Sequence, residues 1–477
     1  MDWQTLLSTE KLVPDEMEPG VFAQYPINEF EKDYNKIVSS AAFRRLQDKT
    51  QVFPLDKSDF VRTRLTHSIE VSTIARQLGI MISENTTRYR PADIRAEDAD
   101  GISSVLLCAG LLHDLGNPPF GHFGETVIGD WFKENLSVIL YKGQPLRNWL
   151  NEQMISDLEH FEGNAQALRI LLKVLHRPGI NLSKAIISTL VKYPTNSISF
   201  NSDDLDIKKH KLGFFLAEQT PFMQISADIG TMDEQNEIHR HPLTYMLEAA
   251  DDIAYATADL EDAFKKGLFS LDEFILFFQS QYCAEDIIPH SSPEYYSDML
   301  INSLIHYREI IQDDGEAIKA WLDYARRWLM YVAVYRFSFK YTEIKSGSYL
   351  DDLFTETNHS LSIKILKAAM GEFAFHTPGI LKLELSAQTI LSFLLDKFVN
   401  AVLYCDYQDE AHGFMPSKAD KKYYQIFSEN YKQDYFAAKT GNESFDLYLR
   451  LLMVTDYISG MTDTYARNLY RELSGIE

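Results

Sequence analysis

The segment of this chain with the most structural information is His113-Asp114-Leu115-Gly116-Asn117-Pro118-Pro119-Phe120-Gly121-His122-Phe123-Gly124-Glu125. An adjacent His–Asp pair ends an apolar run, a Gly/Pro break follows, and a second His and a Glu arrive where the next helix begins. Imidazole and carboxylate groups enter a hydrophobic core only with partners. The stretch therefore predicts a polar site at the junction of two helices.

Further polar residues lie in apolar helical patterns elsewhere, namely His67 upstream and the pair Asp251-Asp252 downstream. Divalent cations accept imidazole nitrogen and carboxylate oxygen together. Adjacent helical residues point about 100° apart, so His113 and Asp114 converge on one ion only at a helix end. Spacing does not choose between Asp251 and Asp252. Taken alone, either Asp fits a solvated position, and His67 fits a core or cap role.

Composition narrows the class of protein. The chain has 477 residues, of which 45% are hydrophobic and 24% charged, as in a globular enzyme. We find no run of apolar residues long enough for a membrane span and no signal peptide at Met1–Pro14. A net charge of −23 argues against a general nucleic-acid coat. Three scattered cysteines, Cys108, Cys283 and Cys405, exclude a disulfide frame and favour the cytoplasm.

Helical periodicity dominates the chain and predicts an all-α fold with at most a small β-hairpin. The polar segment 193–231 contains the strand-like Gly213–Leu216, which we expect to form that hairpin. We divide the chain into an N-terminal segment (1–32), a helical core (33–270) and a helical C-terminal region (271–477). The predicted helices cover 64–78 with a stop near Gly79, 103–115, a helix from about Phe123 through Phe132, 158–175, 183–190 and 243–264.

The pattern His67, His113-Asp114, Asp251 resembles that of the HD-domain metal-dependent phosphohydrolases. It is closer still to the bacterial deoxyguanosine triphosphate triphosphohydrolases, because an ordered set of motifs spans most of the chain. Besides the opening stretch, these motifs are Ser40–Phe53, Val61–Ser68, His160–Gln166, Lys192–Pro194, Glu248–Tyr255 and Ile458–Asp463.

The resemblance implies hydrolysis of a deoxynucleoside triphosphate, with dGTP preferred, to the nucleoside and inorganic tripolyphosphate. It implies a divalent metal ion, Mn or Mg foremost with Co, Fe or Zn as alternatives, on His67, His113, Asp114 and Asp251. By the same resemblance, His122 acts on the reacting phosphate or leaving oxygen and Glu125 orients it. His122 and Glu125 lie three residues apart at a helix start and so share a face.

The remaining site residues are expected to bind the substrate. Arg64 and Lys192, the latter with Tyr193, are candidates for the triphosphate, and His160 is a further phosphate contact or an ordinary helix-start histidine. By resemblance, Tyr255 packs on the sugar and excludes a 2′-hydroxyl, although simple core packing is the alternative. Asp259 and Gln51 are then expected to bond the 3′-hydroxyl. No residue is assigned to the base.

Other readings stay open. The chain is alternatively an HD phosphohydrolase of nucleoside monophosphates or cyclic nucleotides, or a non-catalytic nucleotide or single-stranded DNA sensor. Remoteness of Lys192, Tyr193 and Tyr255 from the metal would favour the first of these. The resemblance also implies a homo-oligomer, often a hexamer, formed through the C-terminal region, which would contribute to the nucleotide pocket.

Overall fold

The computed structural model describes residues 1–14, 28–53, 58–173, 180–282, 289–375, 378–407, 409 and 413–476. Within them the chain is helical apart from one two-stranded hairpin and isolated bridges, so the predicted all-α class is confirmed. No helix in these ranges combines the length and hydropathy that a membrane span needs. Cys108 and Cys405 are free thiols, whereas Cys283 falls outside the described residues.

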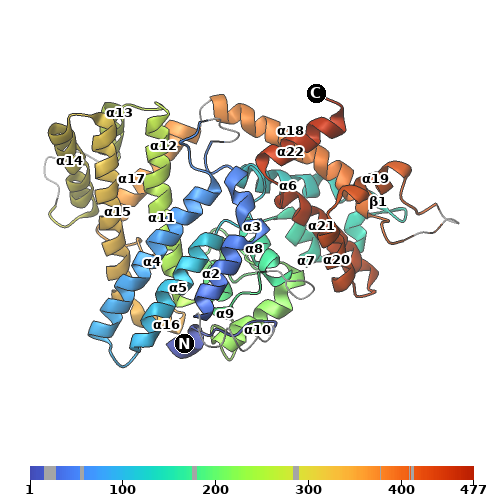
Figure 1. Ribbon diagram of the computed structural model, residues 1–477, viewed down its shortest axis with the longest axis horizontal. Helices are drawn as coiled ribbons and strands as arrows, with labels where there is room; N and C mark the ends of the chain where they lie inside the picture. The colour runs from blue at the N-terminus through green and yellow to red at the C-terminus, as the bar shows by residue number, and fades with distance from the viewer. Residues whose placement is uncertain are drawn as a thin grey trace, which may run out of the picture.

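The elements follow one another as shown in Figure 1. The helices are α1 (Trp3–Leu6), α2 (Glu29–Ser39), α3 (Ala41–Arg44), α4 (Arg64–Tyr89), α5 (Ala96–Leu112), α6 (Gly121–Asn135), α7 (Glu152–Glu159), α8 (Gly163–Leu172), α9 (Lys184–Leu190), α10 (Gln219–Ile229), α11 (Pro242–Ala254), α12 (Leu260–Lys265), α13 (Leu271–Ser280), α14 (Pro293–Ile311), α15 (Asp314–Phe339), α16 (Tyr341–Ser346), α17 (Ser360–Met370), α18 (Pro378–Val402), α19 (Lys418–Ile426), α20 (Glu429–Ala438), α21 (Glu443–Ser459) and α22 (Asp463–Ser474). Short 3-10 turns are η2 (Arg45–Asp48), η3 (Leu146–Trp149), η5 (Ile207–Lys209) and η6 (Leu216–Glu218), and π-helical turns are η7 (Tyr255–Asp259) and η8 (Gly371–Phe375).

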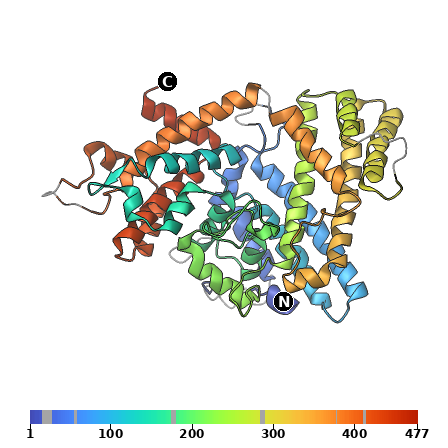
Figure 2. The ribbon, with the colours of Figure 1, turned by 180° about the vertical axis from the view of Figure 1, so that it is seen from behind.

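Two apolar clusters organise the molecule. The first joins α4, α5, α9 and α11 to α15 and α17, and the second joins α6 and α7 to α18, α21 and α22. Figures 1 and 2 show the two groups side by side, with α6 and the red C-terminal helices on the same side. The loop between α5 and α6 therefore runs from one cluster to the other. The division of the chain at residues 32 and 270 stays a prediction.

Helices α4 and α5 pack against each other in the first cluster, and glycine lets the two helices approach closely. A Cβ at Gly79 would lie 2.9 Å from the Cα of Ser103, and a Cβ at Gly110 would overlap the backbone of Ser72. The predicted helix end at Gly79 is therefore wrong. The residue is a packing point inside a long helix, and α4 continues to Tyr89.

Two other predicted helices are interrupted. The segment 158–175 contains a break at residues 160–162, after which α8 begins with the Gly163 amide donating to Glu125. Its last two residues lie outside the described part of the chain. The helix predicted over 243–264 contains the π-helical turn Tyr255–Asp259, and such turns are frequent at functional sites.

The hairpin lies elsewhere than expected. It pairs β1 (Leu140–Tyr141) with β2 (Gln144–Pro145) through Lys142 and Gly143, which both have positive φ. The prediction that Gly213–Leu216 forms a strand is wrong. The Gly213 amide donates to the carbonyl of Thr195, and a Cβ at Gly213 would overlap the Tyr193 carbonyl, so this segment packs as an irregular loop.

Candidate active site

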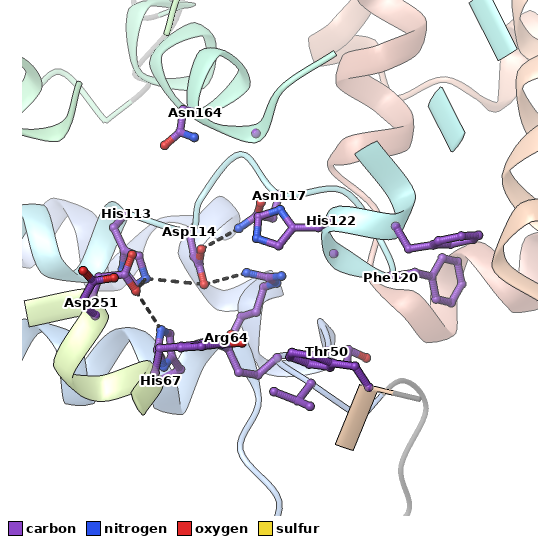
Figure 3. A pocket seen from close by; sticks show the side chains of 18 of the residues that line it. Thr50, Arg64, His67, His113, Asp114, Asn117, Phe120, His122, Asn164 and Asp251 are labelled. Atoms are coloured by element: carbon purple, nitrogen blue, oxygen red, sulfur yellow. Dashed lines mark hydrogen bonds and ion pairs between the residues drawn. The ribbon is translucent and has the colours of Figure 1, made fainter. Parts of the chain in front are cut away.

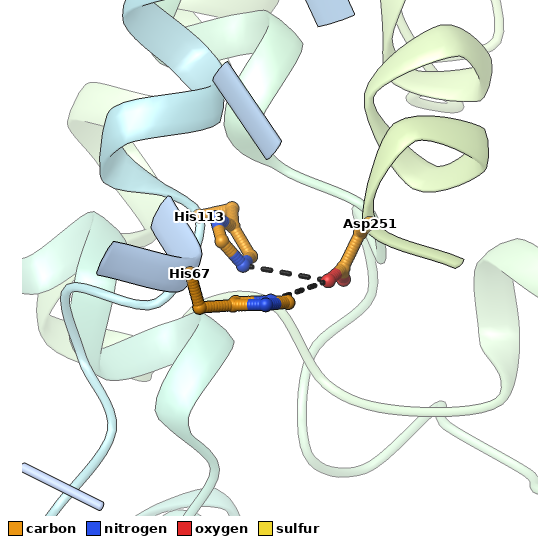
Figure 4. A group of neighbouring side chains, drawn as sticks. All are labelled: His67, His113 and Asp251. Atoms are coloured by element: carbon orange, nitrogen blue, oxygen red, sulfur yellow. Dashed lines mark hydrogen bonds and ion pairs between the residues drawn. The ribbon is translucent and has the colours of Figure 1, made fainter. Parts of the chain in front are cut away.

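Three of the predicted metal ligands meet where α4, α5 and α11 converge. His67 and His113 each direct Nε2 at Oδ1 of Asp251, at 3.3 and 3.4 Å, as Figure 4 shows. One donor atom from each of the three residues lies within 4.8 Å of the others. Two imidazole nitrogens and a carboxylate form a donor set that a divalent ion accepts.

An orphaned nitrogen supports the fit to a metal ion. His113 donates its Nδ1–H to the carbonyl of Gly110 at 2.8 Å, which leaves the Nε2 lone pair facing the site. This Nε2 is buried, and no hydrogen bond to it is found among the described residues. Metal-binding histidines show the same arrangement, with one ring nitrogen held by a carbonyl and the other on the ion.

Asp114 lies beside this group rather than within it. Its Oδ2 is 3.5 Å from Nε2 of His113 and accepts a bond from Arg64 Nη1 at 2.7 Å, while Oδ1 accepts from Asn117 at 2.6 Å (Figure 3). Burial raises the pKa of this carboxyl, but the Arg64 and His113 charges outweigh it and hold the pKa far below its ordinary value. Asp114 is therefore a carboxylate anion that is held in place by the guanidinium of Arg64.

Asp251, not Asp252, faces the histidines. Its second oxygen accepts a bond from Nζ of Lys192 at 2.6 Å. Burial raises the Asp251 pKa, but Lys192 and His113 lower it well below the ordinary value. Asp252 pairs instead with Lys367 at 2.6 Å, and burial raises its pKa to about 6.

His122 and Glu125 form a pair at the start of α6. His122 Nδ1 lies 2.7 Å from Glu125 Oε2, and Glu125 Oε1 accepts from the Gly163 amide at 2.9 Å. The hydrogen bond and charge of Glu125 raise the pKa of His122. Phe120 and Gly121, with φ of 65° and 63°, turn the chain so that His122 faces the cavity. A Cβ at Gly121 would lie 2.7 Å from Arg64 Nη2, so glycine also leaves room for that guanidinium.

One cavity of about 570 Å³ connects these groups. Glu125, Asp259 and His160 are the predicted site residues that do not line it. His160 lies in a neighbouring cavity of about 390 Å³, which it shares with His122 and Lys211. The predicted residues that line the main cavity are Gln51, Arg64, His67, His113, Asp114, His122, Lys192, Tyr193, Asp251 and Tyr255.

Asp259, at the end of the π-helical turn that begins with Tyr255, is buried. Both of its carboxylate oxygens, and Oε1 of Gln51, have no hydrogen-bond partner among the described residues. Burial raises the pKa of Asp259 to about 7. Buried polar atoms without partners are rare in folded proteins and indicate a missing ligand or water.

The structure adds lining residues that sequence reasoning missed. Lys211, paired with Glu162 at 3.1 Å, comes from the segment interpreted as loop and hairpin, where no periodicity marks a position. Lys367 lies on α17, far in sequence from every motif. Asn117 lies within the segment 113–125, directly after Gly116, so the sequence contained a signal that could have identified it as a site residue. The C-terminal region contributes Phe375, Ile380, Leu383 and Glu384.

Comparison with known proteins assigns the chain to the family that its motifs indicate. A family model described as the HD domain matches residues 64–175. A deoxyguanosinetriphosphate triphosphohydrolase-like protein of Listeria innocua is 41% identical over 455 residues, 94% of each chain. A like-named protein of Synechocystis sp. is 32% identical over the whole of both chains. A deoxyguanosinetriphosphate triphosphohydrolase of Serratia proteamaculans is 31% identical over 94% of each chain. The predicted resemblance is confirmed: the chain belongs to the deoxyguanosinetriphosphate triphosphohydrolase-like family of HD-domain hydrolases.

Proposed function

We propose that this enzyme hydrolyses a deoxynucleoside triphosphate, with dGTP preferred, to the deoxynucleoside and inorganic tripolyphosphate. The names of its relatives support the substrate class. The observation that carries the proposal is a single cavity that brings the His67–His113–Asp251 group together with Arg64, Lys192 and His122. A metal-type donor set, cations and a proton donor are the three components that attack at an α-phosphorus requires.

The proposed metal site consists of His67, His113, Asp251 and the adjacent Asp114, with Mn or Mg as the proposed ion. A divalent ion bound there would polarise the α-phosphate and lower the pKa of a bound water. The chain itself is strongly acidic, so the triphosphate needs local cations. Arg64 donates to Asp114, and Lys192 donates to Asp251. Both cations also line the cavity, from different parts of the chain.

The proposed acid is His122. Its Nδ1 is bonded to Glu125, so Nε2–H is the proton that would pass to the departing 5′-oxygen. The hydrogen bond and charge of Glu125 raise the pKa of His122 and so favour its protonated form. Glu125 is a positioning residue, since it is buried behind His122. His160 is proposed as a more distant phosphate contact from the neighbouring cavity.

Sugar recognition is proposed for Tyr255, Asp259 and Gln51. The unpartnered oxygens of Asp259 and Gln51 are suited to a ligand hydroxyl group, here the 3′-hydroxyl. Tyr255 lines the cavity beside them and would pack on the deoxyribose face, where a 2′-hydroxyl has no room.

The location of the protein, its assembly and a further partner are also proposed. We propose a cytoplasmic homo-oligomer, such as a hexamer, that is assembled through residues 271–477, with single-stranded DNA as an open second partner. The alternative of a cyclic-nucleotide or monophosphate hydrolase loses support, because Lys192, Tyr193 and Tyr255 all line the cavity that contains the metal-type group.

The proposal is tested by product analysis. The purified chain is incubated with each of the four deoxynucleoside triphosphates, alone and in pairs, with Mn²⁺ or Mg²⁺. Chromatography should find deoxyguanosine and tripolyphosphate in equal amounts from dGTP. Release of pyrophosphate or of single phosphate would contradict the reaction, and equal rates with all four bases would contradict the preference.

A further inference from the structure

A buried lysine links the active-site loop to the C-terminal helices. The side chain of Lys49 is 3% exposed, and its Nζ donates to the carbonyls of Asn117 and Ser459, at 2.6 Å each. The side chain of Asn117 in turn donates to Asp114. The carbonyl of Lys49 accepts from the amide of Arg64 at the start of α4 at 3.0 Å. Lys49 thus contacts the sequence neighbourhoods of His67 and His113, two of the three residues of the metal-type group.

A buried carboxylate makes a second link. Asp463, at the start of α22, is 2% exposed. Its Oδ1 accepts from the amide of Phe120 at 2.9 Å, and its Oδ2 accepts from the amide of Thr50 at 3.0 Å and from the Thr50 hydroxyl. Thr50 precedes Gln51 and Phe120 stands two residues before His122. One side chain therefore fixes two cavity-lining segments relative to each other.

The second link supports a strained backbone. Phe120 has φ of 65°, in the left-handed region that a bulky residue rarely adopts. Such a residue keeps this conformation only where the surrounding structure holds it. The bond from the Phe120 amide to Asp463 is one such restraint, and it acts where the chain turns to present His122.

The turn that supplies these contacts lies outside the reaction space. None of the residues Ser459 to Asp463, all of which are described, lines the cavity of the proposed active site. The family motif Ile458–Asp463 is therefore not explained by contact with substrate. Its hydrogen bonds reach the site through Lys49, Thr50, Phe120 and Asn117.

We propose that Lys49 and Asp463 are positioning residues, which clamp the segments Thr50–Gln51 and Asn117–His122 to the turn Ser459–Asp463 and so set the place of His122 and Gln51 around the substrate. This inference rests on the proposed function. Displacement of a reacting group by about 1 Å from a distant change lowers a rate by about 100-fold. The turn between α21 and α22 thereby acts on the chemistry although its residues do not line the cavity.

The test compares Asp463→Asn and Lys49→Met with the control Thr464→Val. Lys49→Met keeps the approximate length of the side chain and removes both bonds that Nζ donates. Asp463→Asn keeps the size of the side chain but leaves one acceptor oxygen, so it can hold only one of the two amides that Asp463 binds. The control removes a neighbouring bond, from Thr464 to Asp48 at 2.9 Å, that does not reach the cavity-lining segments. Hydrogen–deuterium exchange of peptides covering 113–124 and 49–53, Mn²⁺ binding by electron paramagnetic resonance, and separate kcat and KM values are measured on folded protein.

Both clamp variants should exchange faster in those peptides and lose about 10- to 100-fold in kcat, with Mn²⁺ binding retained. The control should match the unmodified chain. Faster exchange with unchanged kcat would overturn the proposal, and so would an equal kcat loss in Thr464→Val. If Asp463→Asn fails to fold, Lys49→Met is judged by the same comparison. If the unmodified chain hydrolyses no deoxynucleotide, the proposed function fails, and unchanged exchange in the variants would then separately refute the clamp.

Discussion

Nζ of Lys192 lies 2.6 Å from Oδ2 of Asp251, whose Oδ1 faces both His67 and His113. One carboxylate therefore joins a cation of the substrate pocket to the metal-type group. In the proposed site, substrate and ion would be bound as neighbours, so a change at either is expected to alter both affinity and rate.

Replacement of His113 by Ala should abolish Mn²⁺ binding and turnover. The variant removes Nε2 of His113, which has no hydrogen-bond partner among the described residues. Of the three residues in the metal-type group, only His67 and Asp251 then remain. Isothermal titration with Mn²⁺ measures the loss directly, independent of activity. The exposed His306, on α14, provides the control His306→Ala, which should bind and turn over normally. Normal turnover by His113→Ala would refute the site.

Replacement of Arg64 by Ala should lower kcat/KM by about 100- to 1000-fold, as expected where a charge that stabilises the transition state is removed. Both kcat and KM should change if the guanidinium touches the α-phosphate. Arg64 is buried and paired with Asp114, so a loss of stability is also expected. Thermal unfolding separates the two roles: a lower melting temperature with unchanged kinetics of the folded fraction would leave Arg64 a purely structural partner of Asp114.

Replacement of Glu125 by Gln should change the pH dependence of kcat/KM. In the unmodified chain, Glu125 raises the pKa of His122, so the protonated acid persists to higher pH. Activity is then lost as pH rises through that raised pKa. In Glu125→Gln the loss should move down, toward the ordinary histidine value of about 6.5. Glu134→Gln, which changes an exposed glutamate further along α6, is the control. An unmoved alkaline limb would exclude His122 as the acid.

The sequence predicts the helices that position the site better than their ends. The Gly/Pro break after His113-Asp114 is a local signal, so the end of α5 and the start of α6 fall within a few residues of expectation. Gly79 misleads because a helix-breaking residue and a close-packing residue look alike in one sequence. Whether glycine ends a helix depends on the neighbouring helix, which periodicity does not report.

The same limit applies to the site. His67, His113 and Asp251 stand in motifs, and their convergence agrees with what the motifs imply. Lys211 and Lys367 reach the cavity from an irregular loop and from α17, where no spacing rule marks a ligand position. Asp252 and Asp251 are adjacent and chemically identical, and only the fold shows that one faces histidines while the other faces Lys367. Long-range packing decides these points.

Replacement of Tyr255 by Ala should relax selection of the sugar. Removal of the ring opens space beside Asp259 and Gln51, so a 2′-hydroxyl can enter and the preference for dGTP over GTP should fall by about 10- to 100-fold. The ratio of kcat/KM for the two nucleotides, measured in competition, is the readout. Tyr335→Ala, which changes an exposed tyrosine on α15, is the control and should keep the ratio. A variant that loses activity equally toward both sugars would assign Tyr255 to core packing, because a side chain that only supports the fold has no means of distinguishing a hydroxyl from a hydrogen.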